Sequence, residues 1–220
     1  MDISEITNLL EFVFLAVAGI LPIANPFSSA PLFVSLTANM NSDEQIAQAN
    51  RACFYMALIL IGAFFLGTMI LDFFSITIPA IRLAGGLVIL YIGFGMLFPR
   101  DGKVTEKVVK ETTEQKDFAF TPLAMPMLSG PGSIAVVLEM SARAAEEEEE
   151  LYYELLEGVA ITAGILITVL VCWLVLRGAR SMVKRLGATR IDAMTKMFGF
   201  LLICIGVQFA AGGVMGLANA

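Results

Sequence analysis

The sequence predicts an all-α fold, a polytopic bundle of transmembrane helices with six spans. Hydrophobic residues make up 58% of the 220 residues, charged residues only 15%, and the mean hydropathy is +0.82. These values lie far from those of a soluble domain, in which about a quarter of the residues are charged. Six apolar stretches each have the roughly 20 residues that cross a hydrocarbon core. The lipid bilayer is therefore the expected surrounding of this chain.

The six stretches are continuously apolar, as residues 56–70 illustrate. Strands of a membrane β-barrel alternate apolar and polar residues instead, so we predict helices. The longest connectors, residues 99–117 and 178–192, are too short and too charged to form a soluble domain. The predicted spans are residues 6–38, 45–71, 76–98, 118–142, 152–177 and 193–218.

The basic residues predict the orientation of the chain. Twelve of the 14 lie in or beside the connectors after spans one, three and five, and only Arg82 and Arg143 lie on the other side. Cytoplasmic loops are enriched in Lys and Arg. We therefore expect both termini outside the cytoplasmic membrane, an uncleaved first span, a charged cytoplasmic loop at residues 99–117, and a fourth span that crosses fully instead of re-entering.

Cysteine and histidine usage excludes several kinds of chemistry. The chain has no histidine, and its three cysteines fall one per apolar span, at Cys53, Cys172 and Cys204. This pattern excludes a disulfide framework, a Ser-His or Cys-His catalytic pair and a histidine-ligated metal. No P-loop for ATP is present. We expect that the protein is not an enzyme, binds no cofactor and has no nucleic-acid partner.

The two halves of the chain, residues 1–98 and 118–220, resemble each other. Span three carries Gly86 and Gly93, and span six carries Gly199 and Gly206, each pair seven residues apart. Such glycines form faces on which helices approach closely, either within one chain or between the chains of a homo-oligomer. A repeat of three spans enters the membrane from the opposite side the second time. The halves are therefore predicted to be inverted repeats.

Spans one and four contain clusters of helix-breaking residues near their middles. Residues 21–31 hold three prolines, and residues 125–134 hold two prolines and two glycines. A proline inside a helix costs about 3 kcal/mol, since it removes a donor and clashes with the preceding turn. One proline would only kink a helix, whereas clusters at matching places in two halves predict discontinuous spans.

The breaks are the predicted substrate site. Each restarted helix presents free N–H groups and a positive dipole end that suit a carboxylate. We expect Ser28 or Ser29 and Ser133 as N-caps there, with Pro31 in an early turn. Freed carbonyls and the Asn25 side chain suit an ammonium group or a cation, so a zwitterion satisfies both sets. The predicted binding residues are Asn25, Pro26, Ser28, Ser29, Ser129, Gly130, Pro131, Gly132 and Ser133.

Charged residues within spans are the other candidates for function. Glu139 lies about two turns after the second break, on a stretch that ends near Arg143. It is either a cavity carboxylate that carries a coupling proton or an interfacial residue close to the outer face. Arg82 lies near a span end, where flanking charges are ordinary. The coupling ion is expected to be a proton or Na⁺.

Several of these segments resemble the MarC family of prokaryotic inner-membrane proteins. The similar segments are residues 25–37, 82–86, 122–126 and 129–132, in the family's order and across nearly the whole chain. The resemblance implies membership of the LysE-like transporter group, in which archaeal members are described as small neutral amino acid transporters. Many relatives have Gly-Asn where this chain has Ser28-Ser29, so the resemblance does not fix the substrate.

The residues and the resemblance together predict a secondary transporter for glycine, alanine or similar solutes, working by alternating access. One alternative is an uncoupled channel or facilitator, and another is an exporter of a different small polar solute. An intramembrane enzyme acting on lipid would need an acid–base pair, for which only Glu139 and the serines are available.

Overall fold

The structure is a computed structural model that describes residues 3–98, 117–146 and 151–219, and in this part of the chain all regular secondary structure is helical. The predicted all-α class is thus confirmed. The predicted loop at residues 99–117 lies, apart from Asp117, outside the described residues. The helices are α1 (Ile3–Ala24), α2 (Pro26–Leu36), α3 (Ser42–Phe73), α4 (Ile78–Leu97), η1 (Ala119–Leu128), α6 (Pro131–Glu146), α7 (Leu151–Arg177) and α8 (Ala179–Ala218).

Four helices, α3, α4, α7 and α8, contain stretches long and apolar enough to cross a membrane. Two bent helix pairs, α1 with α2 and η1 with α6, are also long and apolar enough when each pair is taken together, and they bend by 43° and 61° at their junctions. The described residues thus contain four to six candidate spans, and full crossing of the fourth stays a prediction. Large apolar side chains such as Phe54, Phe65 and Leu170 point outward and are more than half exposed, as lipid contact requires. The predicted discontinuity of spans one and four is confirmed.

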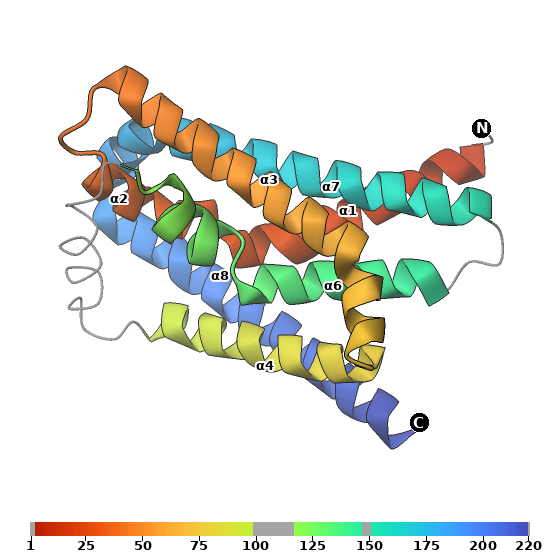
Figure 1. The fold of residues 1–220 in the computed structure, drawn as a ribbon. Helices are drawn as coiled ribbons and strands as arrows, with labels where there is room; N and C mark the ends of the chain where they lie inside the picture. The colour runs from red at the N-terminus through yellow and green to blue at the C-terminus, as the bar shows by residue number, and fades with distance from the viewer. Residues whose placement is uncertain (1–2, 99–116, 147–150, 220) are drawn as a thin grey trace.

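The helices run lengthwise through one bundle (Figure 1), and both termini lie at the same end of it. We call this the terminal end. The α3–α4 turn also lies there, while the α2–α3 and α7–α8 connections lie at the opposite end. The division into residues 1–98 and 118–220 as inverted repeats stays a prediction. Each half does begin with a bent pair.

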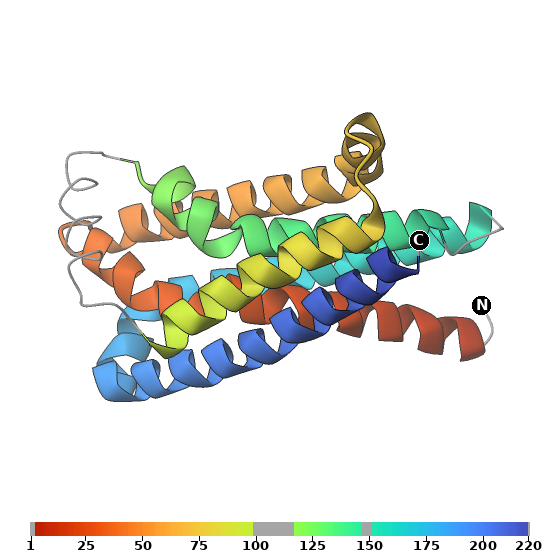
Figure 2. The ribbon, with the colours of Figure 1, turned by 90° about the horizontal axis from the view of Figure 1, so that it is seen from below.

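Helices α4 and α8 lie side by side along their length (Figure 2). Their glycines allow this close approach, because a Cβ on Gly86 would lie 2.5 Å from the Ala210 backbone nitrogen. A Cβ on Gly93 would lie 2.8 Å from the Gly199 carbonyl oxygen. The glycine faces therefore pack within one chain, as the helix-packing interpretation of their spacing predicted.

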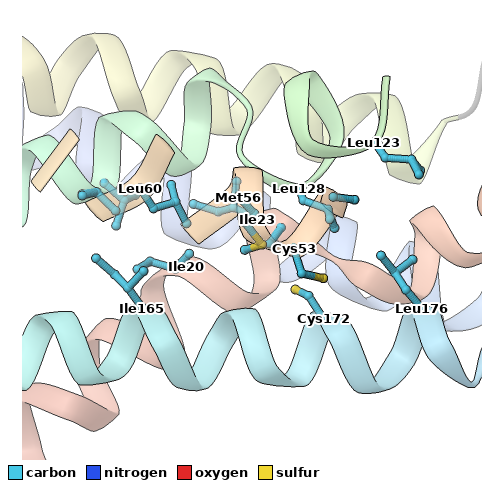
Figure 3. Close-up of a cluster of buried hydrophobic side chains, with 14 of the residues drawn as sticks. Ile20, Ile23, Cys53, Met56, Leu60, Leu123, Leu128, Ile165, Cys172 and Leu176 are labelled. Atoms are coloured by element: carbon cyan, nitrogen blue, oxygen red, sulfur yellow. The ribbon is translucent and has the colours of Figure 1, made fainter. Parts of the chain in front are cut away.

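One buried apolar cluster joins α1, α3, η1 and α7 (Figure 3). Its central side chains include Ile20, Met56, Leu60 and Ile165, all fully buried. Ile23 and Leu128 belong to the same cluster, and each lies just before a helix break. The two breaks are thus anchored on one core.

The predicted connector at residues 178–192 is itself helical, and the stretch of α8 that is apolar enough to cross a membrane begins at Thr189. Helix α8 begins at Ala179 and continues through this segment, with a bend at Gly187, where φ is +73°. The segment is charged, but it consists largely of Arg, Lys, Leu, Met and Ala, which are good helix formers. Only Gly187 adopts a left-handed conformation, which glycine tolerates without steric cost.

Candidate functional site: two helix breaks and a charged cavity

The first break is a single residue, Asn25, in the left-handed conformation with φ 30° and ψ 70°. The Ser28 backbone N–H donates to its Oδ1 at 3.3 Å, so Asn25 is the N-cap of α2. The prediction of Ser28 or Ser29 as the cap is therefore wrong. Helix α2 starts earlier, at Pro26, because proline suits the first helical position with its fixed φ and absent N–H. Pro31 consequently lies in the interior of α2.

The second break is longer, because prolines interrupt the chain twice. Thr121 and Met125 have extended backbones within η1, and each precedes a proline. A proline ring disfavours the helical conformation of the residue before it. The Ser129 hydroxyl and its backbone N–H both donate to the Ala124 carbonyl oxygen at 2.8 Å. These bonds give the Ala124 carbonyl oxygen the hydrogen-bond donors that it lacks because the helix is interrupted.

Helix α6 restarts at Pro131, and its first hydrogen bond runs from the Ile134 N–H to the Gly130 carbonyl oxygen. The predicted N-cap at Ser133 is wrong, since Ser133 lies in the first turn and its hydroxyl donates to the Leu128 carbonyl at 3.4 Å. Gly130 makes the turn, and a Cβ there would lie 2.3 Å from the Pro126 carbonyl oxygen. Only glycine fits this position without a backbone shift.

The two breaks lie next to each other. A Cβ on Gly132 would lie 3.1 Å from both Ile23 and Ile92. One turn further along α4, the Met96 sulfur lies 3.9 Å from the Asn25 side-chain nitrogen. Helix α4 is therefore a common wall of both breaks, which the sequence did not indicate.

The predicted binding residues are mostly packed in protein. Asn25, Ser29, Ser129 and Ser133 are buried, with at most 4% of each residue exposed. Their hydroxyls bond to nearby carbonyls, as Ser29 does to the Asn25 oxygen at 3.4 Å. Solute binding between the breaks stays a prediction, and the structure shows them closed.

A cavity of about 710 Å³ lies between α1, α4, α6, α7 and α8, toward the terminal end of the bundle. Phe12, Leu15 and Phe209 are among its apolar lining residues, and none of the nine predicted binding residues lines it. Gly19 and Val136 both line it and lie against each other, and they lie one helical turn from Ile23 and Gly132. About 6 Å of packed helix therefore separates this cavity from the breaks.

Four of the charged residues that the structure describes line this cavity, namely Arg82 on α4, Glu139 and Arg143 on α6, and Glu157 on α7. Two nitrogens of Arg82, Nε and Nη2, each lie 2.7 Å from Glu139 Oε1, and Arg143 Nε lies 2.9 Å from the same oxygen. The Glu139 side chain is only 7% exposed, against 25% for Arg82 and 49% for Arg143. One buried carboxylate thus holds two guanidinium groups.

The opposite end of the bundle has a smaller cavity of about 160 Å³ below α2. Its lining includes Thr37, Gln45, Arg177 and Arg180. Arg177 lies over the Trp173 ring at 4.9 Å, a cation–π distance. The breaks therefore lie between two cavities of unequal size.

Residues 10–218 match the family described as MarC family integral membrane protein. The inner membrane proteins named MarC from Escherichia coli and from Shigella flexneri are 33% identical to the chain over 214 residues. The alignments cover 94% of this chain and 96% of each relative. The chain belongs to the MarC family. No solved structure matches it.

For this MarC protein, the relatives and the apolar helices establish a multi-pass inner-membrane protein.

The sequence analysis treated Arg82 as an ordinary flanking charge, which is wrong, because Arg82 is partly buried and paired with Glu139. Glu139 is buried and lines the larger cavity, while its role in carrying a coupling proton stays a prediction. An arginine five residues into an apolar stretch was the available signal, since such charges are costly unless paired.

Proposed function

We propose that this MarC protein is a secondary transporter of small neutral amino acids such as glycine and alanine. The observation that carries the proposal is the position of the two breaks, side by side and between two cavities. Secondary transporters bind substrate at discontinuous helices near the midplane and open alternately to each side. Alternating access here means that one predicted repeat rocks against the other around the breaks.

The chemistry of the breaks favours a zwitterion. The backbone N–H groups of Gly132 and Ser133 start α6, where a helix leaves its first donors without acceptors, and they suit a carboxylate. The carbonyls of Ala124 and Leu128 now accept hydroxyl bonds from Ser129 and Ser133. An ammonium group would take over these carbonyls as the breaks open.

Solute from the larger cavity reaches the breaks only after a packed layer moves. Ile20 is fully buried and Ile23 is 6% exposed between the cavity and the breaks. In alternating access, the larger cavity at the terminal end is the substrate pathway in one state of the transporter. In the other state, the substrate pathway is the smaller cavity beside α2 at the opposite end.

Coupling is assigned to a proton at Glu139, because this carboxylate is buried and lines the cavity. Neutralising it would release both arginines. Na⁺ is the alternative coupling ion, and a Glu139→Gln variant separates the two. If a proton at Glu139 couples transport, the variant loses uptake driven by a pH gradient but still exchanges amino acids across the membrane. If Na⁺ couples transport, the variant still takes up amino acids under a Na⁺ gradient.

The direct test is uptake of labelled glycine and alanine by proteoliposomes under a proton or Na⁺ gradient. Saturable uptake supports the proposal, and absence of saturable flux with either gradient contradicts it. Counterflow separates a carrier from a channel or facilitator. Unlabelled substrate inside the vesicle accelerates uptake through a carrier and leaves flux through an open pore unchanged.

The break residues are tested by Ser129→Ala and Ser133→Ala, which remove buried hydroxyls without adding volume. We expect each to lower the maximal flux by at least ten-fold, about 1.4 kcal/mol. The control is Ser35→Ala, because Ser35 is exposed and donates to the Pro31 carbonyl at 2.9 Å. Equal flux in all three variants would contradict the break site.

We also propose that the protein has no enzymatic activity.

A further inference from the structure

The charged end of the larger cavity has a composition that selects its ligand. Among the residues that the structure describes, its charged lining residues are two arginines, Arg82 and Arg143, and two glutamates, Glu139 and Glu157. Charges in a membrane protein's interior are retained only when they are compensated. A ligand with a net charge would unbalance this set, whereas a zwitterion adds one charge of each sign. The lining therefore favours a zwitterion over a simple anion or cation.

The arginines have donors to offer a ligand. Each guanidinium carries five N–H groups, more than one carboxylate oxygen accepts. Arg82 and Arg143 converge on a single atom, Glu139 Oε1, from two helices. This geometry holds two guanidinium groups at one place in the cavity, and a ligand carboxylate is the group that arginine recognises in a bidentate manner.

The rest of the cavity is apolar and large. Phe12 and Leu15 on α1 and Phe209 on α8 are among its walls. A volume of about 710 Å³ lies within the range of roughly 300–1,000 Å³ typical of sites for drug-sized ligands. Glycine would fill little of this space, whereas an amino acid with a large aliphatic or aromatic side chain would bury it against these walls.

We propose that this cavity is a second binding site, for neutral amino acids with large apolar side chains, in which Arg82 and Arg143 bind the carboxylate. Glu139 positions both arginines, and Glu157 accepts the ammonium group from the facing helix α7. The site lies one turn from the breaks and would receive substrate before they do. This inference rests on the proposed function, and it extends the class of substrates beyond glycine and alanine.

The first test uses purified protein and changes only the ligand. Calorimetry should show leucine binding more tightly than alanine, with about a four-fold gain for each buried methylene. Leucinamide, which lacks the carboxylate, should bind at least about ten-fold more weakly, since it forfeits a charge-assisted bond. Equal affinities for leucine and leucinamide would overturn the site, as would affinity that falls with side-chain size.

The second test changes the protein. Arg143→Gln should weaken leucine binding about ten-fold or more and leave leucinamide binding unchanged, and Arg143→Lys should restore part of the loss. Arg143 is chosen because its side chain is half exposed, so its replacement disturbs folding less than that of Arg82. The control is Lys196→Gln, in an exposed pair with Asp192 on α8.

Transport by the same proteins separates the two proposals. If the unaltered protein transports amino acids and Arg143→Gln leaves both KM and leucine affinity unchanged, the cavity site is overturned and the transporter stands. If leucine binds in an Arg143-dependent manner without any flux, the site stands and the transporter fails. Displacement of leucine by phosphatidylethanolamine, with no amino acid flux, would assign the cavity to lipid and overturn the inference.

Discussion

The residues that precede prolines shape both breaks. Asn25 precedes Pro26 and adopts a left-handed conformation, while Thr121 and Met125 precede prolines and are extended. Proline disfavours the helical conformation of the residue before it, although α1 and α2 each accommodate another proline, Pro22 and Pro31, in their interiors. Asparagine is among the few residues that accept a left-handed conformation at low cost, and its side chain then caps the next helix. The steric effect of proline thus contributes to the helix breaks at these three residues.

The most restricted of these residues is Gly130. We predict that Gly130→Ala lowers the free energy of unfolding by about 1–3 kcal/mol, as overpacking does. The added Cβ would meet a backbone oxygen, that of Pro126, which cannot rotate away as a side chain would. Thermal unfolding in detergent measures the effect.

Gly62→Ala on α3 is the matched control for this variant. A Cβ there has no atom within 4 Å. Alanine is the better helix former by about 1 kcal/mol, so we expect equal or higher stability. If the two variants unfolded at the same temperature, the tight turn at Gly130 would not matter for the fold.

At the scale of elements, α4 connects the halves of the chain. Its glycines pack against α8, its Ile89 and Ile92 contact Gly132, and Met96 contacts Asn25. Arg82 near its start reaches Glu139 on α6. One helix therefore touches both breaks and the charged cavity.

We predict that Gly86→Ala separates α4 from α8 and destabilises the protein by about 1–3 kcal/mol. Its Cβ would lie 2.5 Å from the Ala210 nitrogen and 2.7 Å from the Gly206 oxygen. Gly95→Ala on the same helix has no atom within 4 Å and should leave the melting temperature unchanged or raise it. A Gly95 variant that melts below the Gly86 variant would refute the packing argument.

At the scale of the whole molecule, the ends of the bundle differ. The termini and the larger cavity lie at one end, and Arg177 and Arg180 line the smaller cavity at the other. The distribution of basic residues predicts that this second end faces the cytoplasm. The larger cavity would then open toward the outside.

Cysteine labelling tests this orientation. In a chain with Cys204→Ser, whose other cysteines are buried, Asn219→Cys marks the terminal end and Asn39→Cys marks the opposite end. A membrane-impermeant maleimide added to intact right-side-out vesicles should label Asn219→Cys, and Asn39→Cys only after permeabilisation. The reversed pattern would place both termini in the cytoplasm.

Much of the fold was predictable because its determinants are local. The apolar length of each span and the proline clusters at residues 21–31 and 125–134 are readable along the chain. The capping residues were predicted wrongly because the choice between Asn25 and Ser28 depends on where helix resumes after Pro26. The sequence analysis treated residues 178–192 only as a charged connector between spans, although many of these residues favour helix and α8 includes most of them.

The sequence by itself determined a polytopic helical membrane protein with two interrupted helices, since composition and proline positions act on the chain locally. Only the tertiary structure decided that the breaks touch along α4 and that Arg82 meets Glu139, 57 residues away. Such contacts depend on how helices rotate and pack against each other. The small set of glycines between α4 and α8 fixes that packing, and with it the cavity and its charges.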